Sequence, residues 1–390
     1  STVHDATAEL DSDWHMAKLD LERMFNQLGI HPTDQPLVGA RFEVEGQGVK
    51  TFISPRAQFG GMLYPQYAST LMAEVAKILR SYGLKVVFLM DDIFLCGPTR
   101  QACDHALTQA LSILRRIGWI LQDDKIEGPS QELVFLGVLI NTRLRRLSIP
   151  PERMELIIMA IREVLSAHSQ GLLTFRQLMS LVGRLNWCAE VMIAGRPRVK
   201  RIRDCLHQGK WSWRHRNTRR YKGKVTLSIE AIKDLEWWIK AGQAATTTDG
   251  PSPWVPFWSM DRMVTCRVFS DASGEGGFGC IIDDVVYHGT WAPWTQQYSS
   301  GFQELLPILF ALQLVGPRWE NHVVVFTTDN LGNMFALNKG SSRSQDSFQL
   351  IFRIFELAAE YNIYLVADWI PRDYNVFADY VTKVFSPHLL

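Results

Sequence analysis

The chain has 390 residues, of which 47% are hydrophobic and 21% charged, and its formal net charge is +1. This composition is typical of a globular protein of two or three domains and excludes a disordered chain. No apolar run approaches the length of a membrane-spanning helix, and the acidic, polar start is not a signal peptide. The six cysteines form no CxxC pair, which argues against a zinc site or a disulfide framework and favours a reducing compartment.

The first part of the chain has the pattern of an α+β domain. A short strand is expected over 17–21, and Asp20 lies near its end, although a helix N-cap is the ordinary interpretation of that aspartate. Alternating residues predict a hairpin over 38–53. An apolar helix is expected from 65 to 79.

The apolar run from Lys85 to Gly97 contains two adjacent carboxylates, Asp91 and Asp92. Charges among apolar residues are costly unless something compensates them, and Lys85 lies too far along the strand to do so. Two interpretations remain open. The segment is either a hairpin whose turn happens to be Asp-Asp, or a hairpin that presents carboxylates to divalent metal.

Residues 150–243 are predicted to be mainly helical. Amphipathic patterns favour helices over 152–165, 172–187 and 228–242. The segment 244–260 follows, and its threonines, glycine and prolines are typical of an interdomain linker.

A strongly basic stretch runs from 196 to 224 and contains twelve Lys or Arg but only one acid, Asp204. Trp211 and Trp213 are interleaved with these cations. Cations that bind phosphates and aromatic rings that stack on bases are typical of a nucleic-acid groove. The ordinary alternative is a solvent-exposed charged surface. The candidate nucleic-acid-binding residues are Arg196, Arg198, Lys200, Arg201, Arg203, Lys210, Trp211, Trp213 and Arg214.

The last 130 residues carry four carboxylates that follow or interrupt apolar segments. Asp271 ends a strand, Asp329 ends a buried strand, and Asp379 lies in the last predicted helix. Capping explains Asp271 or Asp329 singly, but it does not explain Glu304 on an apolar helix. Four carboxylates in this arrangement are expected of a two-metal nuclease.

The motifs of the first part resemble, in order, the palm of a reverse transcriptase. The matching segments are Lys18-Leu-Asp20-Leu with Phe25, Phe59-Gly60 with Pro65, Met90-Asp91-Asp92, Lys125, and Phe135-Leu136-Gly137. The resemblance implies that Asp20, Asp91 and Asp92 are catalytic and bind two Mg²⁺ or Mn²⁺ ions for nucleotidyl transfer. It implies nucleotide contacts from Phe25, Phe59, Gly60 and Lys125.

The C-terminal part resembles ribonuclease H of the retroelement type, which ends in the Asn375-Val-Phe-Ala-Asp379 signature. The resemblance implies hydrolysis of the RNA strand of a hybrid, again with two metal ions. Its implied catalytic residues and metal ligands are Asp271, Glu304, Asp329 and Asp379. The segment 178–185 is similar to the thumb and connection of DIRS and gypsy retrotransposon polymerases.

These resemblances imply a segment of a retrotransposon polyprotein with α/β fold class. We expect an α+β palm over 1–149 with its fingers largely missing and a helical thumb/connection over 150–243. After the linker, 261–390 is expected to be an α/β ribonuclease H-like domain with a mixed five-stranded sheet. The implied function is RNA-directed DNA polymerase with ribonuclease H activity. The implied partners are an RNA template, a DNA primer, RNA–DNA hybrids and dNTPs, in a cytoplasmic particle or the nucleus, without secretion or a membrane partner.

An alternative function remains. Only 19 residues precede Asp20, where family members carry a fingers portion, and Gln58 stands where proline is usual in the nucleotide loop. A truncated or domesticated element would bind nucleic acid without synthesising DNA, or would keep only ribonuclease H activity.

Overall fold

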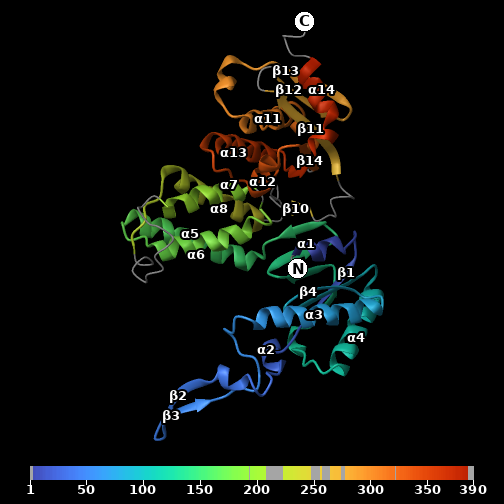
Figure 1. The fold of residues 1–390 in the computed structure, drawn as a ribbon, viewed down its shortest axis with the longest axis vertical. Helices are drawn as coiled ribbons and strands as arrows, with labels where there is room; N and C mark the ends of the chain where they lie inside the picture. The colour runs from blue at the N-terminus through green and yellow to red at the C-terminus, as the bar shows by residue number, and fades with distance from the viewer. Residues whose placement is uncertain are drawn as a thin grey trace. The chain divides into compact units, whose positions relative to one another are not determined.

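The computed structural model describes residues 3–192, 194–207, 223–246, 255–256, 264–273, 277–320 and 322–384. The chain divides into two compact units, traced from blue to red in Figure 1. Unit 1 consists of residues 1–147 and 257–259, and unit 2 of residues 148–256 and 260–390. The helices after residue 150 and the C-terminal α/β segment therefore belong to one unit. Every helix in the described ranges is too short or too polar to cross a membrane.

A four-stranded sheet with the order β4-β5-β1-β6 forms the centre of unit 1. Helices α3 and α4 pack against it and close one hydrophobic core, because their apolar residues recur at helical spacing. The strands are β1 (His15–Asp20), β4 (Lys85–Leu89), β5 (Asp92–Gly97) and β6 (Glu127–Ser130), and the helices are α3 (Tyr64–Ser81) and α4 (Arg100–Arg116).

The predicted hairpin of unit 1 is confirmed as β2 (Ala40–Val44) paired antiparallel with β3 (Gly48–Phe52). A second sheet contains β7, β8 and β9, and the β7–β8 turn has positive φ at both Leu136 (50°) and Gly137 (81°). Two positive φ angles match the twist of a two-residue hairpin. The remaining elements are α1 (Val3–Ala8), α2 (Met24–Gln27), η1 (Gln35–Val38), η2 (Asp123–Lys125), β7 (Glu132–Phe135), β8 (Val138–Asn141) and β9 (Arg146–Ser148).

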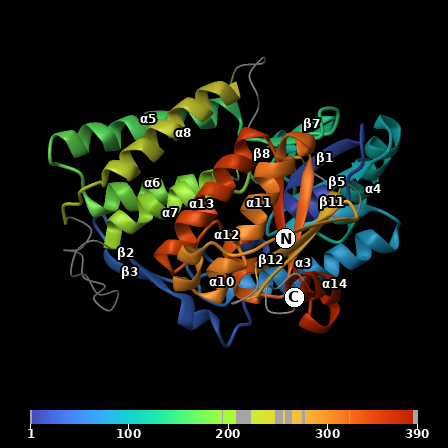
Figure 2. The ribbon, with the colours of Figure 1, turned by 90° about the horizontal axis from the view of Figure 1, so that it is seen from above.

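Unit 2 begins with four helices that pack side by side, as both views show (Figures 1 and 2). They are α5 (Pro151–Ser169), α6 (Phe175–Cys188), α7 (Gly195–Asp204) and α8 (Ile229–Thr246), with η3 (Cys205–His207) after α7. The three predicted helices are confirmed, and α6 starts with a capping box between Thr174 and Gln177. Helix α7 was not predicted, because its charges hide a short apolar stripe that includes the buried residues Val199 and Ile202.

A mixed five-stranded sheet with the order β13-β12-β11-β14-β15 follows, as the sequence predicted. The first three strands pair antiparallel, whereas β11, β14 and β15 run parallel. All six residues of β14 are buried, as expected for a central parallel strand. The strands are β11 (Val264–Ser273), β12 (Gly277–Ile282), β13 (Val285–Gly289), β14 (Val323–Thr328) and β15 (Tyr364–Trp369), and a short β10 (Val255–Pro256) precedes them.

Helices α11 and α13 pack together in the hydrophobic core on this sheet, and α14 packs on β11 and β12. The helical elements of this part are η5 (Pro293–Gln297), α10 (Ser300–Gln303), α11 (Leu306–Val315), η6 (Gly316–Trp319), α12 (Leu331–Lys339), α13 (Gln345–Glu360), η7 (Arg372–Tyr374) and α14 (Val376–Val384). The predicted α/β fold class is confirmed.

Candidate active sites

The three acids of unit 1 meet at one end of its central sheet. Asp20, the last residue of β1, lies directly opposite Asp92 in the antiparallel pairing with β5. The backbone N–H of Leu21 donates a hydrogen bond of 3.2 Å to the carbonyl oxygen of Asp91. Asp91 and Asp92 follow Asp20 by 71 and 72 positions in the sequence. Strand pairing brings them next to it.

The hairpin turn itself is Met90-Asp91, since Leu89 pairs with Asp92. The turn therefore contains only one of the two aspartates, because Asp92 is already a strand residue. Met90 has φ of 54°, which a residue other than glycine adopts at a cost of about 1–3 kcal/mol. This strained position lies next to the acids, where such strain is typical of functional sites.

The carboxylates of unit 1 interact electrostatically. Burial raises the pKa of Asp92 above its usual value, and the charges of Asp91 and Asp20 raise it further. Lys125 Nζ lies 3.2 Å from Asp20 Oδ2, and this hydrogen bond raises the pKa of Lys125. Lys18 instead binds Glu127 Oε1 at 2.8 Å. The structure therefore places Lys125 beside Asp20, and its nucleotide contact stays a prediction.

Two of the predicted nucleotide-binding residues contact each other. The rings of Phe25 and Phe59 meet edge to face with centroids 5.2 Å apart, and Phe59 is 77% exposed. Gly60 follows with φ of 99°, a conformation that favours glycine. The exposed Phe59 and the partly buried Phe25 thus form one aromatic wall, and Gly60 lies next to it in the chain.

The four acids of unit 2 come from four different elements. Asp271 lies on β11, Asp329 directly follows β14, and Asp379 lies on α14. Glu304 was expected inside an apolar helix, but it lies at the C-cap of the short α10, before α11 begins. Pro307 near the start of α11 marks this break between the two helices.

Charge interactions show that these acids share one centre. Burial raises the pKa of Asp271 to about 6, and the neighbouring charges of Asp329 and Asp379 raise it as well. Burial likewise raises the pKa of Glu304 to about 7, again with contributions from Asp329 and Asp271. The structure therefore brings all four predicted acids of the C-terminal part together.

Several polar residues at this centre were not identified from the sequence. Arg372 Nη2 lies 3.9 Å from Asp379 Oδ1, and its Nε lies 4.0 Å from Asp329 Oδ2. Asn333 Nδ2 donates to Glu304 Oε2 at 3.2 Å, and Trp369 Nε1 donates to the carbonyl oxygen of Asp329 at 2.9 Å. Trp369 and Arg372 lie in the segment before the Asn375 signature, but sequence spacing alone does not indicate which acid each side chain contacts.

Within the described ranges, no three His, Cys, Asp or Glu side chains converge at the spacing of metal ligands. A cation lies beside each group of acids instead, Lys125 in unit 1 and Arg372 in unit 2. The donor sets consist of carboxylate oxygens, which suit Mg²⁺ or Mn²⁺ chemically.

The basic stretch is only partly available for phosphate contacts. Arg198 is 7% exposed, and its Nε and Nη2 lie 3.8 Å and 3.7 Å from carboxylate oxygens of Asp234 and Glu356. Arg201 binds Asp234 through two hydrogen bonds of 2.7 and 2.6 Å. For Arg198 and Arg201 the structure corrects the predicted nucleic-acid contact to a packing role, because their charges are already paired inside unit 2.

The other candidates of this stretch differ in their partners. Arg196 donates to the carbonyl oxygens of Ala189 and Asn338, and Lys200 binds Asp204 at 2.6 Å. Arg203 has no hydrogen bond or ion pair with any described residue. Lys210, Trp211, Trp213 and Arg214 lie outside the described residues.

Comparisons with known proteins agree with this geometry. Residues 1–140 match the family model described as reverse transcriptase (RNA-dependent DNA polymerase). The matched residues contain the three acids of unit 1 and Lys125, so the similarity to this family covers the acid centre of unit 1. No curated protein matches the chain.

Three solved structures share the fold over most of the chain, each covering 94% of it. A foamy viral protease-reverse transcriptase in complex with RNA/DNA hybrid has a TM-score of 0.53 and 15% identity. Two further foamy viral protease-reverse transcriptase structures, both in complex with double-stranded DNA, have TM-scores of 0.52 and 0.51 with 14% and 16% identity. The chain spans 45%, 58% and 70% of these proteins respectively.

Proposed function

We propose that the chain is an RNA-directed DNA polymerase that also hydrolyses the RNA strand of RNA–DNA hybrids, and that it derives from a DIRS- or gypsy-like retrotransposon polyprotein. The observation that carries the polymerase is the pairing of Asp20 with Asp92, beside Asp91, inside the segment that matches the reverse transcriptase model. An in-line displacement at phosphorus needs carboxylates from separate strands at one point, and this pairing supplies them.

In the polymerase centre, Asp20, Asp91 and Asp92 would hold divalent Mg²⁺ or Mn²⁺. Bound divalent ions supply charge neutralisation at the reacting phosphate. Lys125 orients the Asp20 carboxylate through its 3.2 Å contact and adds positive charge for the triphosphate of a dNTP. The aromatic wall of Phe25 and Phe59 would border the nucleotide sugar and disfavour a 2′-hydroxyl.

In the nuclease centre, Asp271, Glu304, Asp329 and Asp379 would hold the divalent ions that activate water when bound. Asn333 fixes the Glu304 carboxylate by a hydrogen bond. Arg372 screens the repulsion between Asp329 and Asp379. The substrate is a hybrid, which proteins recognise by its shape and 2′-hydroxyls rather than by its sequence.

The test combines primer extension on an RNA template with hybrid cleavage, each with Mg²⁺ or Mn²⁺. Asp91→Asn should lower extension by at least about a hundredfold and leave cleavage intact, and Asp329→Asn should do the reverse. Asp104→Asn is a matched control, because Asp104 is an exposed acid on α4. Equal activity of Asp91→Asn and the wild type in extension would contradict the polymerase assignment.

A second candidate is a nuclease whose palm binds nucleic acid without synthesising DNA. The observation that favours it is the exposure of large apolar side chains around the aromatic wall, with Met62 at 90% and Phe59 at 77%. Absence of extension together with Asp329-dependent cleavage would select this candidate. If neither activity is found, only nucleic-acid binding remains.

A further inference from the structure

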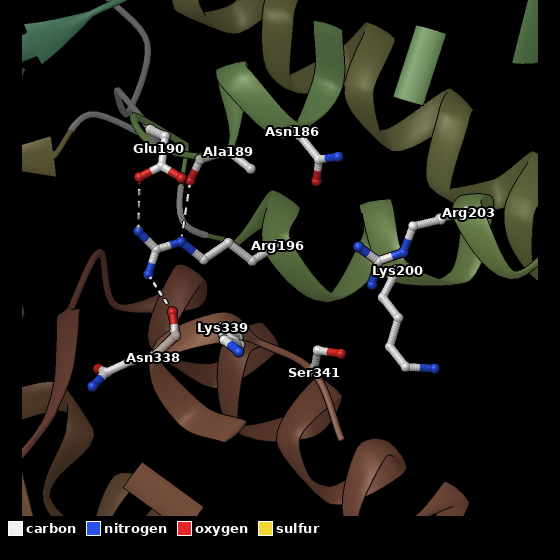
Figure 3. Close-up of a pocket in the computed structure, with 9 residues that line it drawn as sticks. All are labelled: Asn186, Ala189, Glu190, Arg196, Lys200, Arg203, Asn338, Lys339 and Ser341. Atoms are coloured by element: carbon white, nitrogen blue, oxygen red, sulfur yellow. Dashed lines mark hydrogen bonds and ion pairs between the residues drawn. The ribbon is translucent and has the colours of Figure 1, made fainter. Parts of the chain in front are cut away.

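A polar pocket of about 320 Å³ lies in unit 2 between α6, α7 and the end of α12 (Figure 3). None of its lining residues belongs to either group of acids described above. Its volume falls at the lower end of the range of small-ligand sites, which is about 300–1,000 Å³. The pocket is therefore large enough for a small ligand or for part of a larger one.

The lining of the pocket is predominantly cationic. Arg196, Lys200 and Arg203 recur at intervals of four and three residues, so they share one face of α7. Lys339 lines the pocket from the end of α12, and Glu190 is the only acid among the described lining residues. Four cations against one carboxylate favour an anionic ligand.

Two of these cations are already engaged. Arg196 Nη1 donates to the carbonyl oxygen of Asn338 at 2.7 Å, its Nε donates to Ala189, and its Nη2 lies 3.7 Å from Glu190. Lys200 Nζ lies 2.6 Å from Asp204 Oδ2. These contacts hold the two side chains in place along the wall of the pocket.

The other two cations are available for a ligand. Neither Arg203 nor Lys339 has a hydrogen bond or ion pair with any residue that the structure describes, and the weak contact of the Lys339 ammonium is with the Phe335 ring, whose centroid lies 5.9 Å away. In Figure 3 the Arg203 side chain extends back along α7 toward Arg196, on the side of the pocket opposite Lys339. A guanidinium and an ammonium that line the same polar cavity can bind one anion together.

The far wall of the pocket is fixed by a close approach of two helices. Gly340 has φ of 61°, and a Cβ atom there would lie 2.7 Å from the Cβ of Arg196. The Asn338 amide also exchanges two hydrogen bonds with the backbone of Ala367 on β15, at 2.8 and 2.9 Å. Lys339 and Ser341 are thus held at a set distance from α7, so the site exists before a ligand binds.

The chemistry of the lining identifies the ligand class. Among the described residues of the lining there is no aromatic side chain on which a nucleobase would stack. It offers instead a guanidinium, an ammonium, the Ser341 hydroxyl and the Asn186 amide, which are donors suited to phosphate oxygens. We propose that this pocket binds a phosphate group, carried either by a nucleic-acid backbone or by a free polyphosphate.

The first experiment measures pyrophosphate binding to the whole 390-residue chain by calorimetry, with EDTA present so that the acid centres repel the anion. The double variant Arg203→Gln/Lys339→Gln should raise the Kd at least about tenfold, because two charge-assisted contacts are lost. Arg162→Gln/Lys240→Gln is the matched control. It removes the same charge from exposed positions on α5 and α8 outside the pocket, and it should leave the Kd unchanged.

The second experiment identifies the source of the phosphate. It measures binding of a 20-base-pair RNA–DNA hybrid to the wild type and the variants at several salt concentrations. If the wild type binds and the pocket variant lowers the slope of log K against log salt by about one relative to the control, the phosphate belongs to the nucleic-acid backbone. If only pyrophosphate binding depends on the pair, the ligand is a free polyphosphate.

The proposal is overturned if the pocket variant and the control behave alike with both ligands. It does not depend on catalysis, because binding is measured without divalent ions. Loss of extension or cleavage in the acid variants would therefore leave it untouched.

Discussion

A buried carboxylate in unit 2 gives the sharpest test of how its helices are held together. Asp234 on α8 is 2% exposed and binds Arg201 through two hydrogen bonds of 2.7 and 2.6 Å. It also faces Arg198, which stacks on Trp237 with its guanidinium carbon 4.2 Å from the ring centroid. Burial raises the pKa of Asp234 and lowers that of Arg198, so both charges are costly without their partner.

We expect Asp234→Asn to lower the free energy of unfolding of unit 2 by about 3 kcal/mol. Breaking a buried ion pair from one side costs about 3–5 kcal/mol. The lower end applies because Arg201 is 20% exposed and Arg198 keeps a second partner, Glu356, at 3.7 Å. Adding Arg198→Met should recover about 1–2 kcal/mol, since it removes a buried charge that has lost one of its two partners.

The assay is urea unfolding followed by tryptophan fluorescence, because Trp237 and the fully buried Trp238 lie on the same helix as Asp234. Glu155→Gln is the control, since Glu155 is exposed on α5, and it should change stability by about 0.5 kcal/mol or less. The reasoning is refuted if Asp234→Asn costs less than about 1 kcal/mol, or if the double variant is less stable than the single one.

Two further predictions concern the acids and a glycine of unit 2. The folded-state pKa values of Asp271 (about 6) and Glu304 (about 7) exceed ordinary carboxyl values, so the stability they contribute is complete below about pH 4 and is lost as pH rises through 6–7. In the presence of EDTA, the double variant Asp271→Asn/Glu304→Gln should therefore unfold at a higher temperature than the wild type at pH 8. The two proteins should differ little at pH 4. Equal melting curves at pH 8 would contradict this prediction. Gly340→Ala should lower the free energy of unfolding in urea by at least about 1 kcal/mol more than Gly171→Ala does. Both glycines have positive φ, but only at Gly340 would a Cβ atom lie against Arg196. Equal losses of stability would show that the two helices separate freely.

Local patterns predicted much of the fold. The helices α5, α6 and α8 and the hairpin β2–β3 follow from the spacing of apolar residues, which depends only on helical or strand periodicity. Helix α7 was missed, because five of its ten residues are Lys or Arg and only a short apolar stripe contacts its neighbours. Its charges are tolerated because acids from α8 and α13 reach them.

In the candidate sites, too, the sequence indicated the residues, whereas their contacts depend on the tertiary structure. The order of the acids along the chain was sufficient to select the carboxylates that the structure places near one another. Strand register decided that Asp20 faces Asp92 while Asp91 forms the turn, and register is a property of paired strands. The contacts of Arg372 with Asp329 and Asp379 likewise depend on how separate elements pack.

The sequence by itself determined the acids, the fold class and the concentration of positive charge between 196 and 224. Only the tertiary structure decided which of the charges on the described residues of this stretch are paired. Arg198 and Arg201 are neutralised by Asp234, more than thirty residues further along the chain, whereas Arg203 faces a pocket completed by Lys339. The physical reason is that the fate of a charge depends on its neighbours in space, and those neighbours come from segments distant in sequence.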